Sequence, residues 1–245
     1  MQKIAKEQRR AIRHRLRGWR LAIVEGSPAW LRRSVGPAVL YADMLLVDHG
    51  IFRLFYLNRH KLGERAWRSA QPAPHQIGQI ARLGVRTIVN LRGPRVCGSY
   101  WLEQSACERQ GLKLVDYQVR SRAAPSKEEV LGARHLLETI EYPALLHCKS
   151  GADRAGLMST LYMIVHEKRS VAEAKEQLAF KFGHIRQSDT GILDYFFERY
   201  LSDTEVKPMP FFEWVETVYD PEELLQSFRA KGWANLITNR ILRRE

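Results

Sequence analysis

The stretch LLHCKSGADRAG, residues 145–156, places one of only three cysteines, Cys148, between two different patterns. Residues 143–148 (PALLHC) are apolar and predict a buried strand, whereas residues 155–167 (AGLMSTLYMIVHE) predict a helix. A strand that leads into a glycine-bearing loop and then a helix forms an anion cradle, because backbone N–H groups and the positive helix end point to one place. The stretch therefore predicts an anion-binding loop around Cys148.

The residue types in this loop indicate one kind of chemistry. The cradle favours the thiolate form of Cys148, so we expect this side chain to be a nucleophile at neutral pH. Arg154 stands where its guanidinium can bind two oxygens of a phosphoryl group. Together they predict phosphoryl transfer through a cysteinyl-phosphate intermediate. We expect the remaining loop residues to surround the substrate or to orient the loop from behind: His147, Lys149, Ser150, Gly151 and Ala152.

Strand and helix patterns alternate along most of the chain. This alternation predicts an α/β fold with a central parallel-rich sheet that is flanked by helices on both faces. Strands are expected at residues 85–93, 112–119 and 143–148, and helices at residues 75–84, 100–111, 127–140 and 155–167.

The two ends of the chain predict helical extensions. Residues 1–24 alternate basic and apolar residues at near-helical spacing, and residues 37–58 (PAVLYADMLLVDHGIFRLFYLN) predict a second helix that packs against the core. The sequence DPEE at residues 220–223 predicts the start of a C-terminal helix, whose negative end suits Arg240, Arg243 and Arg244. We therefore expect a basic N-terminal extension over 1–60, a phosphatase domain over 61–204 and a C-terminal extension over 205–245.

The net charge of +12 is concentrated near the start of the chain, because residues 1–33 hold ten basic residues and two acidic ones. Such a segment suits an acidic lipid surface or nucleic acid, and a solvated arm is the alternative. No recognised RNA-binding module or aromatic–basic stacking surface is present, so no nucleic-acid partner is expected. No apolar run approaches the roughly 20 residues of a membrane span or the core of a signal peptide. We expect a cytoplasmic protein that docks on the inner face of the membrane.

His147, Cys148 and Arg154 have the spacing His-Cys, five residues, Arg, which resembles the signature of the cysteine-dependent tyrosine and dual-specificity phosphatases. The resemblance covers roughly residues 64–200. RSAQP (68–72) and IVNLR (88–92) are similar to the opening segment and the first core strand of bacterial members. The resemblance implies the dual-specificity-like phosphatase fold, and hydrolysis of phosphomonoesters without a metal or cofactor.

Two departures from this family concern the proton transfers. Most members have Ser or Thr after the arginine, and its hydroxyl helps the cysteine thiolate to leave; Ala155 stands there, which implies slower breakdown of the intermediate. The loop that carries the family's general acid corresponds to RSRAAPS (120–126), which contains no carboxylate. A phosphate-binding pseudophosphatase would explain this absence, but such proteins usually lose the cysteine or the arginine.

Asp153 and Asp116 are the candidate general acids. Asp116 lies at about the family's distance before Cys148, but within a predicted strand. Asp153 lies inside the loop, and the ending GxDR resembles the atypical lipid phosphatases of bacteria, in which the loop aspartate serves as the acid. Ala152 replaces the lysine of that second family. We favour Asp153 as the acid and keep open both Asp116 and a structural role for Asp153.

Basic residues near the loop predict a positively charged mouth: Arg92, Arg95, Arg120, Arg122, Lys149 and Arg186. Such a mouth favours a phosphorylated lipid, phosphoinositide or sugar, with a phosphoprotein as the second choice and an RNA-directed phosphatase behind it. Gln187 or Asp189 is a candidate to hold the attacking water, although a plain surface turn is equally compatible. Cys97 is a candidate to form a protective disulfide with oxidised Cys148.

Overall fold

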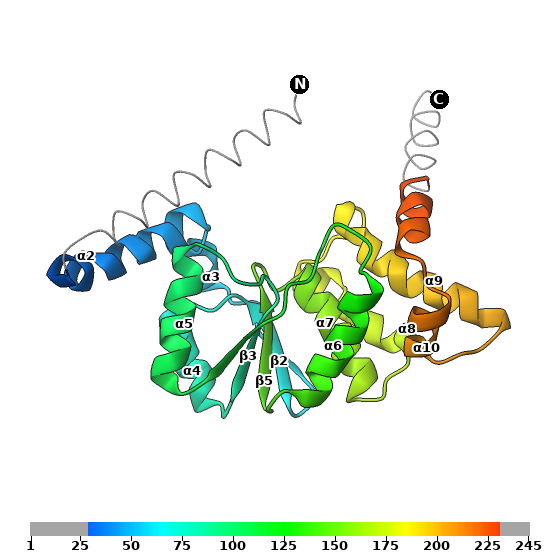
Figure 1. Ribbon diagram of the computed structural model, residues 1–245, viewed down its shortest axis with the longest axis horizontal. Coiled ribbons are helices and arrows are strands. Elements are labelled where there is room, and N and C mark those ends of the chain that lie inside the picture. Colours follow the sequence, from blue (N-terminus) through cyan, green and yellow to red (C-terminus); the bar gives the residue numbers. More distant parts are fainter. Residues whose placement is uncertain (1–28, 231–245) are drawn as a thin grey trace, which may run out of the picture.

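The computed structural model describes residues 29–230, so the predicted helix over residues 1–24 and the three C-terminal arginines lie outside the described residues. Its centre is a five-stranded sheet of order β1-β2-β5-β3-β4 (Figure 1). The strands are β1 (His60–Leu62), β2 (Ala66–Ala70), β3 (Thr87–Asn90), β4 (Lys113–Asp116) and β5 (Ala144–Cys148). All neighbours pair in parallel except β1, which is antiparallel to β2. The predicted parallel-rich α/β sheet is confirmed.

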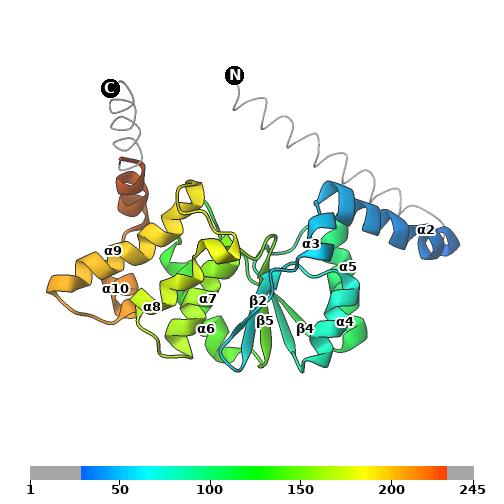
Figure 2. The same ribbon diagram turned by 180° about the vertical axis from the view of Figure 1, so that it is seen from behind.

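Helices cover both faces of the sheet. On one face lie α4 (Pro74–Arg82) and α5 (Gly98–Gln110), and on the other lie α6 (Lys127–Thr139) and α7 (Asp153–Val165). Beyond α6 and α7 stands a further layer, which Figure 2 shows from behind: α8 (Val171–Ala174), α9 (Ile192–Val206) and α10 (Phe211–Thr217).

Side chains of the central strand alternate between the two apolar cores, because successive residues of a strand point to opposite faces. Leu145 packs with Ile77 and Ile88 in the core beneath α4 and α5. Leu146 and Cys148 belong to the larger core beneath α6 and α7. The alternation places Cys148 on the α7 side of the sheet, where its loop leads into that helix.

The predicted start of the helix over residues 127–140 is confirmed by a capping box. Ser126 Oγ accepts a hydrogen bond from the backbone N–H of Glu129, and the Glu129 carboxylate accepts one from the backbone N–H of Ser126. The C-terminal helix start is confirmed too: residues 221–230 are helical, and Asp220 Oδ1 accepts hydrogen bonds from the backbone N–H groups of Glu222 and Glu223.

The prediction of one helix over residues 37–58 is wrong. The segment consists of α2 (Ala29–Ala42), the π-helical turn η1 (Asp43–Val47) and α3 (Ile51–Phe55), followed by extended chain. The chain turns at Gly50, where a Cβ atom would lie 2.5 Å from the Met44 carbonyl oxygen. The turn buries Asp48 and Arg53 as an ion pair. The prediction of a continuous helix with an apolar face did not include such a buried pair.

Within residues 29–230, no helix combines the length and the apolar character that crossing a bilayer requires.

Candidate active site

The predicted geometry of strand, loop and helix around Cys148 is confirmed. Cys148 is the last residue of β5, the middle strand of the sheet, and it is 2% exposed. The helix α7 begins at Asp153, two residues earlier than predicted, so Asp153 and Arg154 stand in its first turn. Cys148 pairs in register with Ala70 of β2, which lines the cleft described below. The predicted nucleophile therefore lies just beneath the lining of that cleft, near the positive end of α7.

Gly151 gives the loop its tight turn. Its φ is +76°, a left-handed conformation that side chains with a Cβ atom rarely adopt. A Cβ atom at this position would also lie 2.6 Å from the backbone nitrogen of Ala70. A glycine is therefore required here by both backbone conformation and space.

Two side chains from outside the loop bind its carbonyl oxygens. Asn58 Nδ2 donates to the Ser150 oxygen at 3.0 Å, and Arg68 Nη2 donates to the Gly151 and Ala152 oxygens at 2.7 and 3.0 Å. Because a trans peptide is planar and its N–H points opposite to its C=O, these contacts turn the N–H groups of the following residues away from Asn58 and Arg68. The loop is thereby held in the form that presents amides to an anion.

Arg68 is buried on β2 and remains a cation at neutral pH. Burial lowers its pKa to about 10, and the nearby Cys148 and Asp153 act in the opposite direction. Its guanidinium also stacks over the Phe182 ring, at 4.1 Å from the ring centroid. The RSAQP motif predicts that Arg68 belongs to the domain, but no pattern in the sequence indicates that Arg68 and Asn58 bind the loop.

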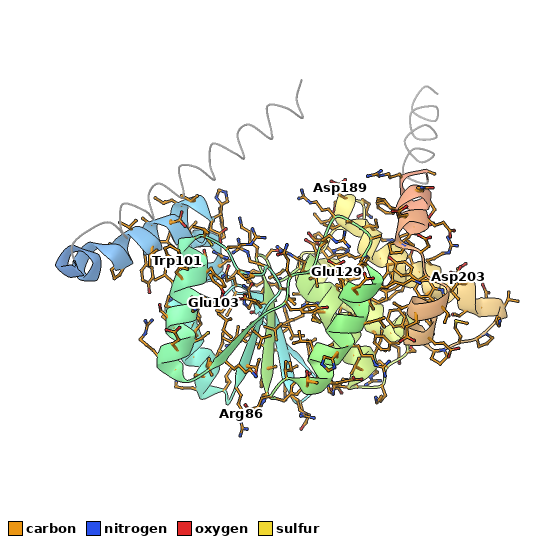
Figure 3. The ribbon with its side chains drawn as sticks, viewed as in Figure 1. Arg86, Trp101, Glu103, Glu129, Asp189 and Asp203 are labelled. Carbon is orange, nitrogen blue, oxygen red and sulfur yellow. The ribbon has the colours of Figure 1, made fainter. Side chains whose placement is uncertain are left out.

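His147 lies behind the loop, on the face of the sheet opposite to Cys148. Its Nε2 is 2.8 Å from Glu103 Oε1, although neither ring nitrogen makes a well-aligned hydrogen bond within the described residues. Glu103 projects from the inner side of α5 (Figure 3), and its other oxygen accepts a hydrogen bond from Gln71. His147 is fully buried and does not line the cleft, so its position agrees with the expected orienting role behind the loop and corrects its place among the substrate-binding residues.

Asp153 is held by a histidine that the sequence analysis missed. His184 lies with its Nδ1 2.8 Å from Asp153 Oδ1 and its Nε2 2.6 Å from Asp194 Oδ2. Burial acts to lower the pKa of His184, but its hydrogen bonds to the two carboxylates outweigh this and raise the pKa to about 9. An imidazolium therefore joins α7 to α9 at neutral pH. The side chain of Asp153 lines the cleft.

Asp116, the other candidate acid, is engaged at the end of β4. Its Oδ1 accepts a hydrogen bond from Asn90 Nδ2 at 2.7 Å, and its Oδ2 accepts one from the Tyr100 hydroxyl at 2.6 Å. Asp116 is not among the residues that line the cleft. Both oxygens are thus used in contacts within the fold, whereas Asp153 reaches the cleft.

An open cleft of about 1110 Å³ lies over the loop. Lys149, Ser150, Asp153 and Arg154 form its floor, and residues 118–123 form one wall. The wall includes residues 120–123 of the segment that corresponds to the family's acid loop. Asp153 is the one acidic residue among those that line the cleft. The substrate-binding residues predicted from the sequence thus divide: Lys149 and Ser150 line the cleft, whereas Gly151 and Ala152 shape the loop beneath it.

Four of the six basic residues predicted at the mouth line the cleft, and the other two do not. Arg92 is buried against Asp48, and Arg186 pairs with Glu198 outside the cleft. Arg120 lines the cleft but pairs with Glu129 at 2.8 Å. Five other cations line it, one of which, Arg53, is paired with Asp48: Arg53, Arg95, Arg122, Lys149 and Arg154. Arg154 makes no ion pair with an acidic side chain within the described residues, so its guanidinium is available to a ligand in the cleft.

A buried acidic group stands next to Lys149. Asp48 Oδ1 lies 3.5 Å from Lys149 Nζ, and the same carboxylate accepts hydrogen bonds from Arg92, Arg53 and Ser99. Burial acts to raise the pKa of Asp48, but the hydrogen bond and charge of Arg92, with the charge of Arg53, hold it well below its usual range. Asp48 and Arg53 come from the N-terminal segment, so residues before 60 support the loop.

Three further expectations have different outcomes. Gln187 and Asp189 are exposed and do not line the cleft, and Asp189 lies at the outer end of its loop (Figure 3), which corresponds to the surface-turn alternative. Cys97 is fully buried at the start of α5, and none of the three cysteines is in a disulfide, so its pairing with oxidised Cys148 stays a prediction. Among the described residues, no cluster of three or more His, Cys, Asp or Glu side chains has the arrangement of a metal site.

Comparison with known proteins agrees with this site. Residues 57–192 match the family model described as DSP-PTPase phosphatase fused to NAD+ kinase. The dual specificity protein phosphatase TpbA of Pseudomonas aeruginosa is 29% identical over 124 residues, which span 50% of this chain and 53% of that protein. This chain thus spans about half the length of the curated relatives it matches.

Several solved structures are similar to part of this chain. The crystal structure of P. aeruginosa TpbA is 21% identical, with a TM-score of 0.49 over 58% of this chain and 84% of that one. The crystal structure of PTPMT1 is 17% identical, with a TM-score of 0.45 over 61% of this chain and 99% of that one. The family model covers more than half of the chain and includes Cys148 and Arg154. This chain therefore belongs to the DSP-PTPase family of phosphatases.

Proposed function

We propose that this phosphatase hydrolyses a phosphorylated lipid, either a membrane phospholipid, a phosphoinositide or a phosphorylated glycolipid. The supporting observation is the width and charge of the cleft over Cys148. At about 1110 Å³ it is slightly larger than the roughly 300–1,000 Å³ typical of small-molecule sites, and five cations besides Arg120 line it. A headgroup with more than one negative group fits this lining better than a single phosphotyrosine.

The loop supports a two-step reaction. The Cys148 thiolate attacks phosphorus and the bond to the leaving oxygen breaks, while Arg154 binds two non-bridging oxygens and the loop amides bind the developing charge. Asp153 passes a proton to the leaving oxygen. Water then attacks the phosphorus, the S–P bond breaks, and the Cys148 thiolate and inorganic phosphate are released. Asp153, as the carboxylate that the water faces, takes the proton in this second step.

His184 and Asp194 are assigned to orient this acid. His184 donates to one oxygen of Asp153, and the second oxygen makes no hydrogen bond within the described residues. The second oxygen is therefore available to a leaving group in the cleft. Asp194 fixes the opposite side of the His184 ring, so the imidazole plane cannot rotate without losing a hydrogen bond.

A second candidate is a phosphoprotein substrate. The observation that favours it is the curated relative TpbA, which is named a dual specificity protein phosphatase and is 29% identical over half of this chain. The lipid proposal and this alternative share the chemistry at Cys148 and differ in what the cleft walls bind.

A substrate panel tests the proposal. We would measure kcat/KM on a phosphoinositide, a phosphotyrosine peptide and p-nitrophenyl phosphate, and we expect the highest value on the phosphoinositide. Cys148→Ser should abolish turnover on all three. Cys107→Ser is the matched control, because burial raises the pKa of that thiol to about 12 and it lies in the core under α5. A higher kcat/KM on the peptide would favour the protein-phosphatase alternative.

A further inference from the structure

Exposed apolar side chains are concentrated in one short segment next to the cleft. Among the described residues, twelve large hydrophobic side chains are exposed, and half of them lie within residues 41–56. These six are Tyr41, Leu46, Ile51, Phe52, Phe55 and Tyr56. Phe52 is 73% exposed and Phe55 is 87% exposed. Single exposed apolar residues are common on protein surfaces, but a cluster of this kind marks a site that binds another protein or a membrane.

The short helix α3 has the reverse of the usual surface arrangement. It buries the charged side chain of Arg53, which is 7% exposed, and it exposes Phe52 and Phe55. Arg53 is held inside by Asp48, Gln71 and Ser99, so the fold fixes the aromatic side chains outward. Rotating α3 to bury the phenyl rings would leave Asp48 without one of its two arginine partners, which is costly in a buried site.

This exposed surface is continuous with the mouth of the active-site cleft. Phe52, Phe55 and Tyr56 line the same cleft as the cationic residues Arg95 and Arg122. Aromatic rings beside cationic groups are the composition found at the headgroup level of a bilayer, where rings enter the interface and cations bind anionic lipid. We name Phe52, Phe55 and Tyr56 the aromatic rim.

We propose that the aromatic rim docks on an anionic lipid bilayer and holds the cleft mouth against the headgroup layer. The proposal rests on the proposed function for the identity of the substrate, but the docking surface is defined by its own residues. Docking would bring a lipid phosphate to Cys148 without removing the lipid from the membrane. It also gives the exposed phenyl rings an apolar environment, which water does not.

Charge favours a bilayer over a second copy of this chain. Face-to-face association through the rim would bring the cations of the two clefts together, and like charges across an interface oppose association. An anionic bilayer offers the complementary sign. The ten basic residues of segment 1–33 carry charge of the sign that an anionic surface attracts.

Vesicle co-sedimentation of the full chain tests the docking surface. The vesicles are phosphatidylcholine alone or phosphatidylcholine mixed with phosphatidylglycerol. The rim variant is Phe52→Ser with Phe55→Ser, and the matched control is Leu83→Ser with Val206→Ser, two exposed apolar residues that do not line the cleft. We expect the rim variant to bind the mixed vesicles about tenfold more weakly or worse, because two rings no longer enter the interface, and the control to bind as wild type.

A gain-of-signal variant keeps the test independent of any loss of folding. Trp at position 55, in Phe55→Trp, should be quenched by brominated lipid more strongly than Trp at position 206, in Val206→Trp. Equal vesicle binding by the rim variant and its control, or equal quenching at the two positions, would overturn the proposal. A dimer in solution that the rim variant loses would also overturn it, because the surface would then be an interface between copies.

A failure of membrane docking can be distinguished from a failure of the proposed lipid phosphatase function. Wild-type enzyme that hydrolyses p-nitrophenyl phosphate but does not bind the mixed vesicles refutes docking and leaves the phosphatase chemistry intact. Rim-dependent vesicle binding without hydrolysis of any lipid phosphate supports docking and refutes the proposed substrate.

Discussion

Two buried charge clusters flank the Cys148 loop, and their arrangements are opposite in sign. On the Lys149 side, the carboxylate of Asp48 lies between the guanidinium groups of Arg53 and Arg92. On the Asp153 side, the imidazole of His184 lies between two carboxylates. The first cluster surrounds an anion with cations, and the second surrounds a cation with anions.

The two clusters differ in how they respond to pH. The pKa of Asp48 lies well below its usual range and arginine stays protonated, so the first cluster keeps its charges at every pH at which the protein is studied. His184 has a pKa of about 9, so the second cluster loses its central charge in moderately alkaline solution. The Asp48 cluster therefore supports the Lys149 side of the loop with charges that do not change with pH. The His184 cluster supports the side of the proposed acid with a charge that does change with pH.

Removing the central anion should have the largest effect on stability. Asp48→Ala leaves Arg53 and Arg92 buried without their shared carboxylate, and breaking a buried ion pair in this way costs about 3–5 kcal/mol. Urea unfolding would measure the loss. Glu138→Ala is the control, because Glu138 forms an exposed pair with Arg134 that is worth only about 0.3–0.5 kcal/mol. A loss below about 1 kcal/mol in Asp48→Ala would show that the cluster is not a support.

Changing the acid should affect the rate in a way that depends on the leaving group. Asp153→Asn should slow cleavage of alkyl phosphates by about 10²–10⁴-fold, because alkoxides leave poorly without a proton, and should slow p-nitrophenyl phosphate much less. Asp116→Asn is the control and should alter stability more than this ratio, since both of its oxygens are engaged in the fold. Selectivity for the leaving group lost only in Asp116→Asn would transfer the acid to that residue. Equal losses on both substrates in Asp153→Asn would assign it a structural role.

The titratable cluster should make stability depend on pH. Folding raises the pKa of His184 from 6.5 to about 9, so its contribution is complete below pH 6.5 and is lost as the pH rises through 9. The difference corresponds to about 3 kcal/mol. Urea unfolding at a series of pH values should show this loss in the wild type, and His184→Gln should lack that part of it. Parallel pH profiles for the two proteins would contradict the protonated His184.

The sequence predicted the parts of the site that are contiguous in the chain. Cys148, Gly151 and Arg154 lie within one strand, loop and helix, so their spacing carried the information. Arg68 and Asn58 contact the loop across 83 or more residues, and no local pattern pairs them with it.

The absence of any local pattern for long-range contacts also explains why His184 was missed and why one helix was predicted over residues 37–58. His184 meets Asp153 across 31 residues, and from the sequence alone it was one polar residue in a turn. The periodicity of residues 37–58 predicted one helix because it counts apolar positions. It could not show that Asp48 and Arg53 would be buried together by contacts with Arg92 and Ser99.

The most direct test of the central claim is to trap phosphate on the loop. Wild-type enzyme turning over p-nitrophenyl phosphate would be quenched in acid and digested, and the phosphorylated residue located by mass spectrometry. We predict phosphate on Cys148, accumulating in the steady state because Ala155 provides no hydroxyl to help the thiolate leave. Cys148→Ser should carry no phosphate there. Active enzyme with an unmodified Cys148 and phosphate on another side chain would contradict the cysteinyl-phosphate mechanism.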